Sequence, residues 1–500
     1  MRDKYPRSFP FPHLSFPQLL AGIQGFFVPG WVARMEGQKR KTLDSRFRGN
    51  DRVWQWGVIL LTVACSVVLL GATGAGQPSP EERLGLAERA FAQGDFQKTV
   101  DLVEPLLDDA PWRRASFRLK MLSLARLGKT ADGIRVYEQF VETDGSDEGL
   151  LRELAVQSIL PFRADMREQV RGAAYSALKE IPSDEVVPYF QDGLSDGSGM
   201  IRVLVVEGMG KFPKGLQSES FRNALKDQAG LVRVTVLKAL GGMGDPAAIP
   251  LVAPLLKDEH RVVQVAAAAA LYRLGQKEHW QTVEQATNVP EGYERGGALR
   301  MLGEIGDPKG LPLLEQGLRD KQPSIRAAAA ASLGKLGSSK GIPFLIKALA
   351  DPVPAVRSVA AVTLGKLRAE RAVSSLTRVL QDRNPGVRAA AVAGLLQLSS
   401  PFSVMAGTVR ELMGQQNPGL RSSVAKALSH GRARDVVGPL LLLLNDPVPK
   451  PRISAARSLG RVGGRELIPR LKPLMKDQNE AVRATAAGAI ARLLSASPEA

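Results

Sequence analysis

Arginine recurs at nearly constant intervals along the C-terminal two thirds of the chain, usually six residues after an aspartate. The series consists of Arg171, Arg202, Arg233, Arg295, Arg326, Arg357, Arg388, Arg421, Arg452 and Arg483, with Gln264 standing once in the same position. Regularly spaced guanidinium groups could follow the phosphates of a nucleic acid. They could also form charge-assisted hydrogen bonds with carboxylates of the same chain. The elements that carry the arginines decide between these two chemistries.

These arginines lie in a repeated sequence unit. From Pro308 onward the chain divides into consecutive segments of nearly equal length, 308–338, 339–369 and 370–400, and further units begin at Pro401, Ala433 and Arg465. Looser units begin near Asp147, Pro182, Leu216, Pro246 and Lys277. About eleven units in one register predict a repeat architecture.

Each unit predicts two helices. The first has apolar residues at helical spacing, as at Ile342, Leu345 and Leu349, and ends at a turn that contains aspartate. The second often opens with proline, as at Pro354, continues through an alanine-rich stretch and ends at glycine or a small polar residue. Neither helix can bury its apolar face alone, so neighbouring units must stack. The prediction is an all-α, right-handed α-solenoid over residues 147–495.

The shared core of the units is a turn Asp, then Pro, then Val or Ile followed by Arg, then two alanines. Asp351, Pro354, Val356 and Arg357 show it clearly. The units resemble HEAT repeats, specifically the short type found in phycobilisome lyase-like proteins. The resemblance covers residues 147–495 and implies the fold. It also brings two enzyme classes to mind, bilin lyases and HEAT-like DNA glycosylases, but no residue here singles out a bilin pocket or a base-binding cleft.

The helical setting favours a structural role for the arginines. Each would lie in the first turn of a second helix, close to turn carbonyls and to aspartates of the neighbouring unit, and would bridge adjacent repeats. The second helices also offer few aromatic side chains on which bases could stack. The predicted inter-repeat ladder consists of Arg326, Arg357, Arg388, Arg421, Arg452 and Arg483 with Asp320, Asp351, Asp382, Asp446 and Asp477.

One unit, residues 277–307, departs from the pattern. It lacks the turn aspartate and carries two aromatic residues, Trp280 and Tyr293. A break in a solenoid can mark a partner site, and Trp280 and Tyr293 are the candidate partner contacts. The alternative is a drifted repeat whose aromatic side chains fill a gap.

A second kind of repeat precedes the solenoid, over residues 77–146. Leu86, Gly94, Phe96, Val103 and Pro111 have spacings that resemble a tetratricopeptide (TPR) repeat, and a second copy follows with Gly128 and Tyr137. Thr99 replaces the usual small alanine, and Gly145 stands where proline is expected. We expect this short helical segment to pack on the first HEAT unit as a cap.

The segments outside the repeats bear on the compartment. Residues 1–52 match neither repeat, and we interpret them as a disordered extension that is not native to the protein. Residues 53–76 combine a short apolar run with small residues, after Arg46, Arg48 and Arg52, which predicts a signal peptide or a membrane anchor. Membrane contact would then involve residues 53–72. Residues 496–500 form a tail.

Composition and charge limit the function further. The formal charge is +17; residues 1–56 hold ten Lys/Arg against four Asp/Glu and 77–148 hold ten against fourteen, which leaves +15 for residues 149–500. A charge of this size attracts acidic proteins, nucleic acid or anionic lipid. No phosphate-binding loop, HExxH or CxxC motif occurs, and Cys65 is the single cysteine, so we expect no catalytic, cofactor or metal site.

The sequence therefore predicts a non-enzymatic scaffold of the bacterial cell envelope that binds other proteins. The repeats would lie in the periplasm, exported or anchored to the inner membrane. A nucleic-acid-binding solenoid is the first alternative and a bilin lyase-like enzyme the second. Because an exported protein has no access to the chromosome, we do not expect nucleic acid as a partner.

Overall fold

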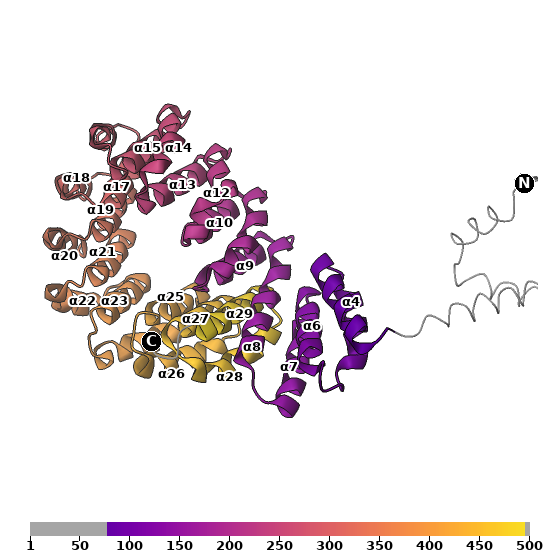
Figure 1. Cartoon of the computed structure of the whole chain (residues 1–500). Helices are drawn as coiled ribbons and strands as arrows, with labels where there is room; N and C mark the ends of the chain where they lie inside the picture. The colour runs from indigo at the N-terminus through magenta and orange to yellow at the C-terminus, as the bar shows by residue number, and fades with distance from the viewer. Residues whose placement is uncertain (1–77, 496–500) are drawn as a thin grey trace, which may run out of the picture. The chain divides into compact units, whose positions relative to one another are not determined.

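The computed structural model describes residues 78–495, which fold as helices and turns without a strand in that range (Figure 1). This confirms the prediction of an all-α solenoid. The predicted extension over 1–52, the signal peptide or anchor over 53–76 and the tail over 496–500 lie outside the described residues. Within residues 78–495, no helix combines the length and the apolar character needed to span a membrane.

The N-terminal part of the described chain consists of two helical pairs. They are α4 (Pro80–Gln93) with α5 (Phe96–Val103) and α6 (Arg113–Arg126) with α7 (Thr130–Asp144). Gly94 and Gly128 end the first helix of each pair with φ of +83° and +76°, a conformation that glycine adopts without strain. Thr99 is buried, and its hydroxyl donates to the carbonyl of Asp95 at 2.9 Å, so the threonine is satisfied within its own helix.

Eleven second helices form one continuous row, each packed against the next. They are α9 (Glu168–Glu180), α10 (Gly199–Met209), α13 (Gly230–Met243), α15 (Arg261–Arg273), α17 (Gly292–Ile305), α19 (Pro323–Leu336), α21 (Pro354–Lys366), α23 (Pro385–Gln397), α25 (Pro418–Leu428), α27 (Pro449–Val462) and α29 (Glu480–Ser495). Five of them begin at the predicted proline, whose missing N–H costs nothing at that position.

The first helices are shorter and lie on the other side of this row. Figure 1 shows α18 (Leu311–Gly317), α20 (Ile342–Ala348) and α22 (Val373–Val379) outside α19, α21 and α23. The other units begin with α8 (Glu148–Ile159), η3 (Asp184–Ser195), α12 (Glu219–Asn223), α14 (Ile249–Val252), α16 (Trp280–Ala286), α24 (Ala406–Met413), α26 (Ala433–Leu444) and α28 (Ile468–Leu471) with η13 (Lys472–Lys476). The second helices therefore form an inner row and the first helices an outer row.

Small residues allow neighbouring second helices to approach closely. A Cβ atom on Gly365 would lie 2.7 Å from the Cα atom of Gly394, and one on Gly303 would lie 2.9 Å from the Cα atom of Ser332. Side chains at these positions would push the helices apart. The alanine- and glycine-rich composition of the second helices is thus what the close packing requires.

The row of second helices closes on itself. The last helix, α29, packs along α9 and α8 of the first unit as well as along α27. A Cβ atom on Gly488 of α29 would lie 2.7 Å from the Cβ atom of Ala177 of α9, the same close approach as between consecutive units. The repeat pattern of the sequence does not show this closure. The small rotation from one repeat to the next, summed over the array, determines closure, and no single unit encodes it.

Polar contacts cover this seam between the last and first units. Arg461 Nε donates to Glu180 Oε2 at 2.9 Å, and Arg465 Nη1 donates to Glu148 Oε2 at 2.6 Å. The N-terminal helical pairs join the same seam, because α6 packs against α8 and Lys472 Nζ of η13 pairs with Glu138 Oε1 of α7 at 2.9 Å. The segment predicted to cap the first unit therefore contacts the last unit too.

Candidate functional site on the inner face of the second helices

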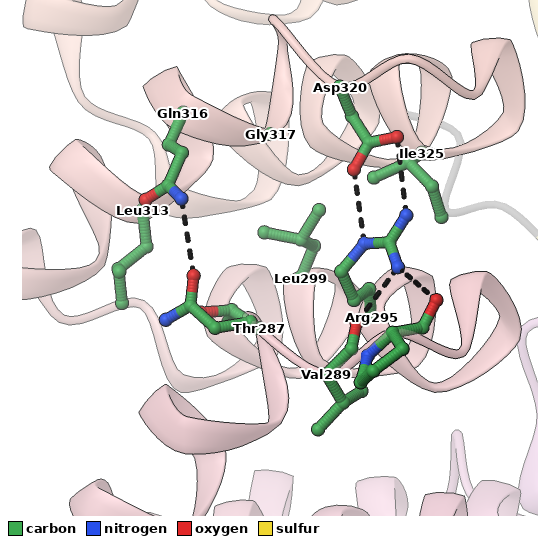
Figure 2. A pocket seen from close by; sticks show the side chains of 11 residues that line it. Thr287, Val289, Arg295, Leu299, Leu313, Gln316, Gly317, Asp320 and Ile325 are labelled. Atoms are coloured by element: carbon green, nitrogen blue, oxygen red, sulfur yellow. Dashed lines mark hydrogen bonds and ion pairs between the residues drawn. The ribbon is translucent and has the colours of Figure 1, made fainter.

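The arginine series, called here the ladder arginines, joins successive repeats. Figure 2 shows one pair: Arg295 Nε and Nη2 donate to the two carboxylate oxygens of Asp320 at 3.0 and 3.3 Å, and Nη1 donates to the carbonyls of Val289 and Pro290. Four other pairs have the same bidentate geometry. They are Arg326 with Asp351, Arg357 with Asp382, Arg421 with Asp446 and Arg452 with Asp477.

Three upstream arginines have the same kind of partner, namely Arg171 with Asp196, Arg202 with Asp227 and Arg233 with Asp258. Two predicted members differ. Arg388 Nη2 pairs with Glu411 Oε1 at 2.5 Å, because the longer unit that follows places no aspartate there. Arg483, on the last helix, pairs with Glu480 of its own helix at 3.6 Å.

The ladder is interrupted once, and the interruption affects both partners. In the regular pairs the aspartate lies 25 residues after the arginine, and the residue 25 positions after Gln264 is Val289. Gln264 Nε2 still donates to the carbonyl of Asp258 at 2.6 Å, which is the backbone bond that a ladder arginine makes. The arginine that is missing at position 264 and the turn aspartate that is missing at position 289 would have formed one pair. Neutral residues therefore replace both members of that pair.

The ladder leaves little positive charge for a ligand. Arg357 and Asp382 are almost fully buried, and all three nitrogens of the Arg357 guanidinium donate to Asp382 or to the carbonyls of Asp351 and Pro352. Burial opposes ionisation of Asp382, but the hydrogen bonds from Arg357 and from the Asn384 N–H outweigh it and lower the pKa of Asp382. These arginines are internal structural groups and cannot follow the phosphates of a nucleic acid.

The structure separates the two candidate partner contacts. Trp280 is half-buried in a first helix, where its ring centroid lies 5.6 Å from that of Tyr272 and its Nε1 donates to Glu284 at 3.1 Å. Tyr293 lies on the second helix of the same unit and is 70% exposed. Trp280 therefore fills space within the repeat, and Tyr293 is available to a ligand.

Two further features have the outward form of a chemical site, a pocket and a cluster of possible metal ligands. The pocket in Figure 2, of about 300 Å³, is lined by Arg295, Asp320 and Gln316, but its polar groups bond to one another or to backbone, including Gln316 Nε2 to Asn288 Oδ1 at 3.2 Å. Asp258, Glu259 and His260 lie close enough together to hold a cation. The guanidinium of Arg233 already occupies the centre of that cluster, within hydrogen-bond distance of all three, so its charge takes the place of a metal ion.

Free positive charge gathers elsewhere on the second helices. The positions two before, five after and nine after the ladder residue are separated by seven and four residues, so they lie on one face of each helix. We call these positions the inner face. The positions five and nine after the ladder hold three glutamates and ten basic residues. The basic residues are Lys211, Lys238, Arg273, Arg300, Lys335, Lys366, Lys426, Arg457, Arg461 and Arg492.

Contacts that skip a repeat show that this face is strongly concave. Lys238 Nζ of α13 pairs with Glu304 Oε1 of α17 at 2.9 Å, across the intervening helix α15, whose residue there is Ala269. Arg461 of α27 likewise reaches Glu180 of α9 across α29. Side chains can span two helix spacings in this way only where the helices converge, so the face points toward the inside of the curved row.

The three inner-face carboxylates are already neutralised. Glu180 pairs with Arg461, Glu207 with Lys179, and Glu304 with both Lys238 and Lys335. Six of the ten basic residues make no ion pair within residues 78–495: Lys211, Arg273, Arg300, Lys366, Lys426 and Arg457. The inner face thus carries an excess of unpaired positive charge.

Like charges lie close together at one end of this face. Desolvation and then the charges of Arg457 and Lys450 lower the pKa of Lys426, and desolvation followed by Arg461 and Lys366 lowers the pKa of His430. The Nε atom of Arg457 is buried and has no hydrogen-bond partner. An anion on this face would relieve the repulsion between these like charges.

Sequence reasoning missed the inner face because it followed the ladder. A signal was present: Lys or Arg at positions five and nine after the ladder residue lie one helical turn apart and recur from unit to unit. That spacing alone does not say whether the residues face solvent on the inside or the outside of the array. The contacts that skip a repeat answer this question.

The fold and this face define a repeat scaffold for interaction. The family profile described as HEAT repeats matches residues 218–294, 281–361, 342–429 and 436–500, which together exceed half of the chain. The chain belongs to the HEAT-repeat family, and the resemblance predicted from the ladder motif is confirmed. The TPR-like interpretation of residues 77–146 stays a prediction. No curated protein sequence matches the chain.

Several solved structures are similar in fold. Human deoxyhypusine hydroxylase in complex with glycerol is 19% identical, covering 51% of this chain and 98% of that one, with a TM-score of 0.25. The complex of CpcE and CpcF of phycocyanin lyase from Nostoc sp. is 21% identical, covering 48% and 92%, with a TM-score of 0.33. A Kap121p mutant is 12% identical, covering 80% and 56%, with a TM-score of 0.34. At these values the likenesses carry no argument about function.

Proposed function

We propose that this HEAT-repeat protein is a non-enzymatic scaffold of the bacterial cell envelope that binds acidic segments of other proteins on its inner face. The observation that carries the proposal is the set of six cations at the positions five and nine after the ladder residue that have no carboxylate partner, beside three carboxylates that are all paired. A protein partner with exposed Asp and Glu would complete these pairs. Many such contacts along a repeat surface give specificity through their number and spacing.

The proposal of a non-enzymatic role rests on how the polar side chains are used. The aspartates at the repeat turns bind ladder arginines and cap helices, which lowers the pKa of Asp351 and Asp446 and keeps them ionised. General acid–base catalysis needs a group whose pKa is close to the working pH. Carboxylates held in this way serve stability.

The envelope location rests on residues 53–76. Three arginines precede this short apolar run, and small residues follow it. That order is typical of an export signal, with the basic side kept in the cytoplasm and the following chain sent across the membrane.

Nucleic acid is the competing partner, because a basic concave face attracts phosphates too. Two features favour a polypeptide. The regularly spaced ladder arginines are already ion-paired with aspartates of the same chain. At the position two before the ladder residue, the inner face also offers a single aromatic side chain, Tyr293, beside the apolar Met200, Leu231 and Val262, which is a poor platform for stacking bases.

Site-specific photo-crosslinking in bacterial cells tests the proposal. A photoreactive residue replaces Lys366 on the inner face or, as a matched control, Lys347 on first helix α20 of the same repeat; both lysines are exposed. We expect protein adducts from position 366, in the periplasmic or membrane fraction, and few from position 347. Adducts to nucleic acid at position 366, or equal protein adducts at both positions, would contradict the proposal.

A further inference from the structure

Four consecutive second helices carry an apolar residue at the same inner-face position, two before the ladder residue. They are Met200, Leu231, Val262 and Tyr293, each 31 residues after the previous one. Met200, Leu231 and Tyr293 are 61%, 49% and 70% exposed, and Val262 is half-buried. We call these four residues the apolar stripe.

The apolar stripe is confined to units two to five. The next three second helices have Ser324, Ala355 and Gly386 at this position, so no large apolar side chain continues the row. At its other end the stripe meets a groove of about 370 Å³ between α9 and α10, lined by Met200, Leu204 and Gly172. Exposed apolar side chains in one row, with a groove at the end, are typical of a surface that another chain covers.

Unpaired cations lie beside the stripe on three of its four units. Lys211, two residues after the end of α10, Arg273 of α15 and Arg300 of α17 follow the apolar residues by two to three helical turns. The unpaired charge therefore forms a second row parallel to the stripe. A partner that fits both rows must be apolar along one edge and acidic along the other.

We propose that the apolar stripe and the adjacent cations Lys211, Arg273 and Arg300 bind an amphipathic, acidic helix of a partner protein. This deepens the proposed function and rests on it. The axes of packed helices, here the successive second helices, lie about 8–10 Å apart. In a partner helix laid across them, residues seven positions apart are separated by about 10.5 Å, so one apolar residue per heptad of the partner meets one repeat. Four repeats require a helix of about 20 residues.

The occupant comes from another protein because the chain's own outlying segment has the wrong charge. Residues 1–56 hold ten Lys/Arg and four Asp/Glu, so they are repelled by the inner face. The acidic residues 78–148 are already folded in the helical pairs at the seam. Charge complementarity leaves an acidic partner.

Fluorescence anisotropy with the full chain, purified in mild detergent, tests this inference. The probes are a 22-residue peptide with leucine at every seventh position and glutamate along one flank, a scrambled peptide of the same composition, oligoglutamate of equal charge, and duplex DNA. We expect the ordered peptide to bind at least tenfold more tightly than the scrambled peptide. Equal affinity for these two peptides, or tighter binding of DNA, would overturn the inference.

Substitutions separate the apolar contribution to peptide binding from the charged contribution. Met200→Ser/Leu231→Ser/Tyr293→Ser should weaken the ordered peptide tenfold or more and change oligoglutamate binding less than twofold. The matched control is Leu251→Ser/Val404→Ser/Leu442→Ser, three exposed apolar residues of the first-helix segments, which should bind like the unmodified protein. Equal thermal unfolding of both triple variants, measured by circular dichroism, shows that each is folded.

The two proposals fail in different ways. If Lys211→Glu/Arg273→Glu/Arg300→Glu weakens every acidic probe but the stripe variant binds the ordered peptide normally, the stripe inference is wrong and the proposed function stands. If neither variant changes the binding of any acidic probe, both are wrong.

Discussion

The interrupted ladder provides a quantitative test of how the repeats are joined. Gln264 and Val289 occupy the positions that Arg357 and Asp382 occupy three repeats later. The chain thus contains its own neutral version of the pair. Transplanting that version, as Arg357→Gln with Asp382→Val, separates the energy of the ion pair from that of the surrounding packing.

The expected magnitudes follow from burial. Arg357 and Asp382 have side chains that are 7% and 12% exposed and share two hydrogen bonds of 2.8 Å. Removing one partner leaves a buried charge, which costs about 3–5 kcal/mol of stability. The glutamine of Arg357→Gln should keep one carbonyl bond, as Gln264 does. The double variant leaves no charge uncompensated, so we expect it to lose only about 1–2 kcal/mol.

Urea unfolding followed by circular dichroism measures the three variants, and hydrogen exchange of α21 and α23 locates the effect. The double-variant cycle should give a coupling free energy above about 2 kcal/mol. Losses that simply add, with a coupling below about 0.5 kcal/mol, would refute the view that each arginine and aspartate act as a compensating pair.

Three other predictions concern the seam, the pH and the ladder. Gly488→Val should destabilise the protein and increase its radius of gyration in small-angle X-ray scattering, since a Cβ atom at position 488 would lie 2.7 Å from the Cβ atom of Ala177. The control Gly438→Ala, with open space around it, should be neutral or slightly stabilising. Equal changes in stability and size for the two variants would contradict the tight seam. Hydrogen bonds from Arg421 lower the pKa of Asp446 despite burial, and those from Arg167 lower the pKa of Asp165 to about 2. Because these folded-state values lie below the unfolded ones, their stabilisation is present above about pH 3.8 and is lost as pH falls toward 2; a melting temperature that stays constant from pH 5 to 2 would count against it. Arg357→Glu should lower the melting temperature, and normal stability with lost partner binding would reverse the structural interpretation of the ladder.

The sequence by itself determined the repeat unit. The 31-residue interval, the prolines that open the second helices and the Asp–Arg spacing follow from local chemistry, in which each residue contacts its own helix or the next unit. The pairing of Arg357 with an aspartate of an adjacent repeat could therefore be anticipated, and the failure of one pair was visible as Gln264 and as a missing turn aspartate. The sequence also singled out Trp280 and Tyr293 as candidate partner contacts, but it did not show that Tyr293 is exposed and Trp280 half-buried.

Only the tertiary structure decided where the array ends and which face is concave. The contact of Gly488 with Ala177 depends on a rotation accumulated over all the units, and no local pattern specifies that sum. The same curvature brings Lys238 to Glu304 across a whole repeat and leaves Lys426 and Arg457 unpaired beside each other. The curvature determines whether basic residues on the helices are separately solvated or form one binding face. On the concave side the basic residues of successive helices come close together, which favours an anionic partner.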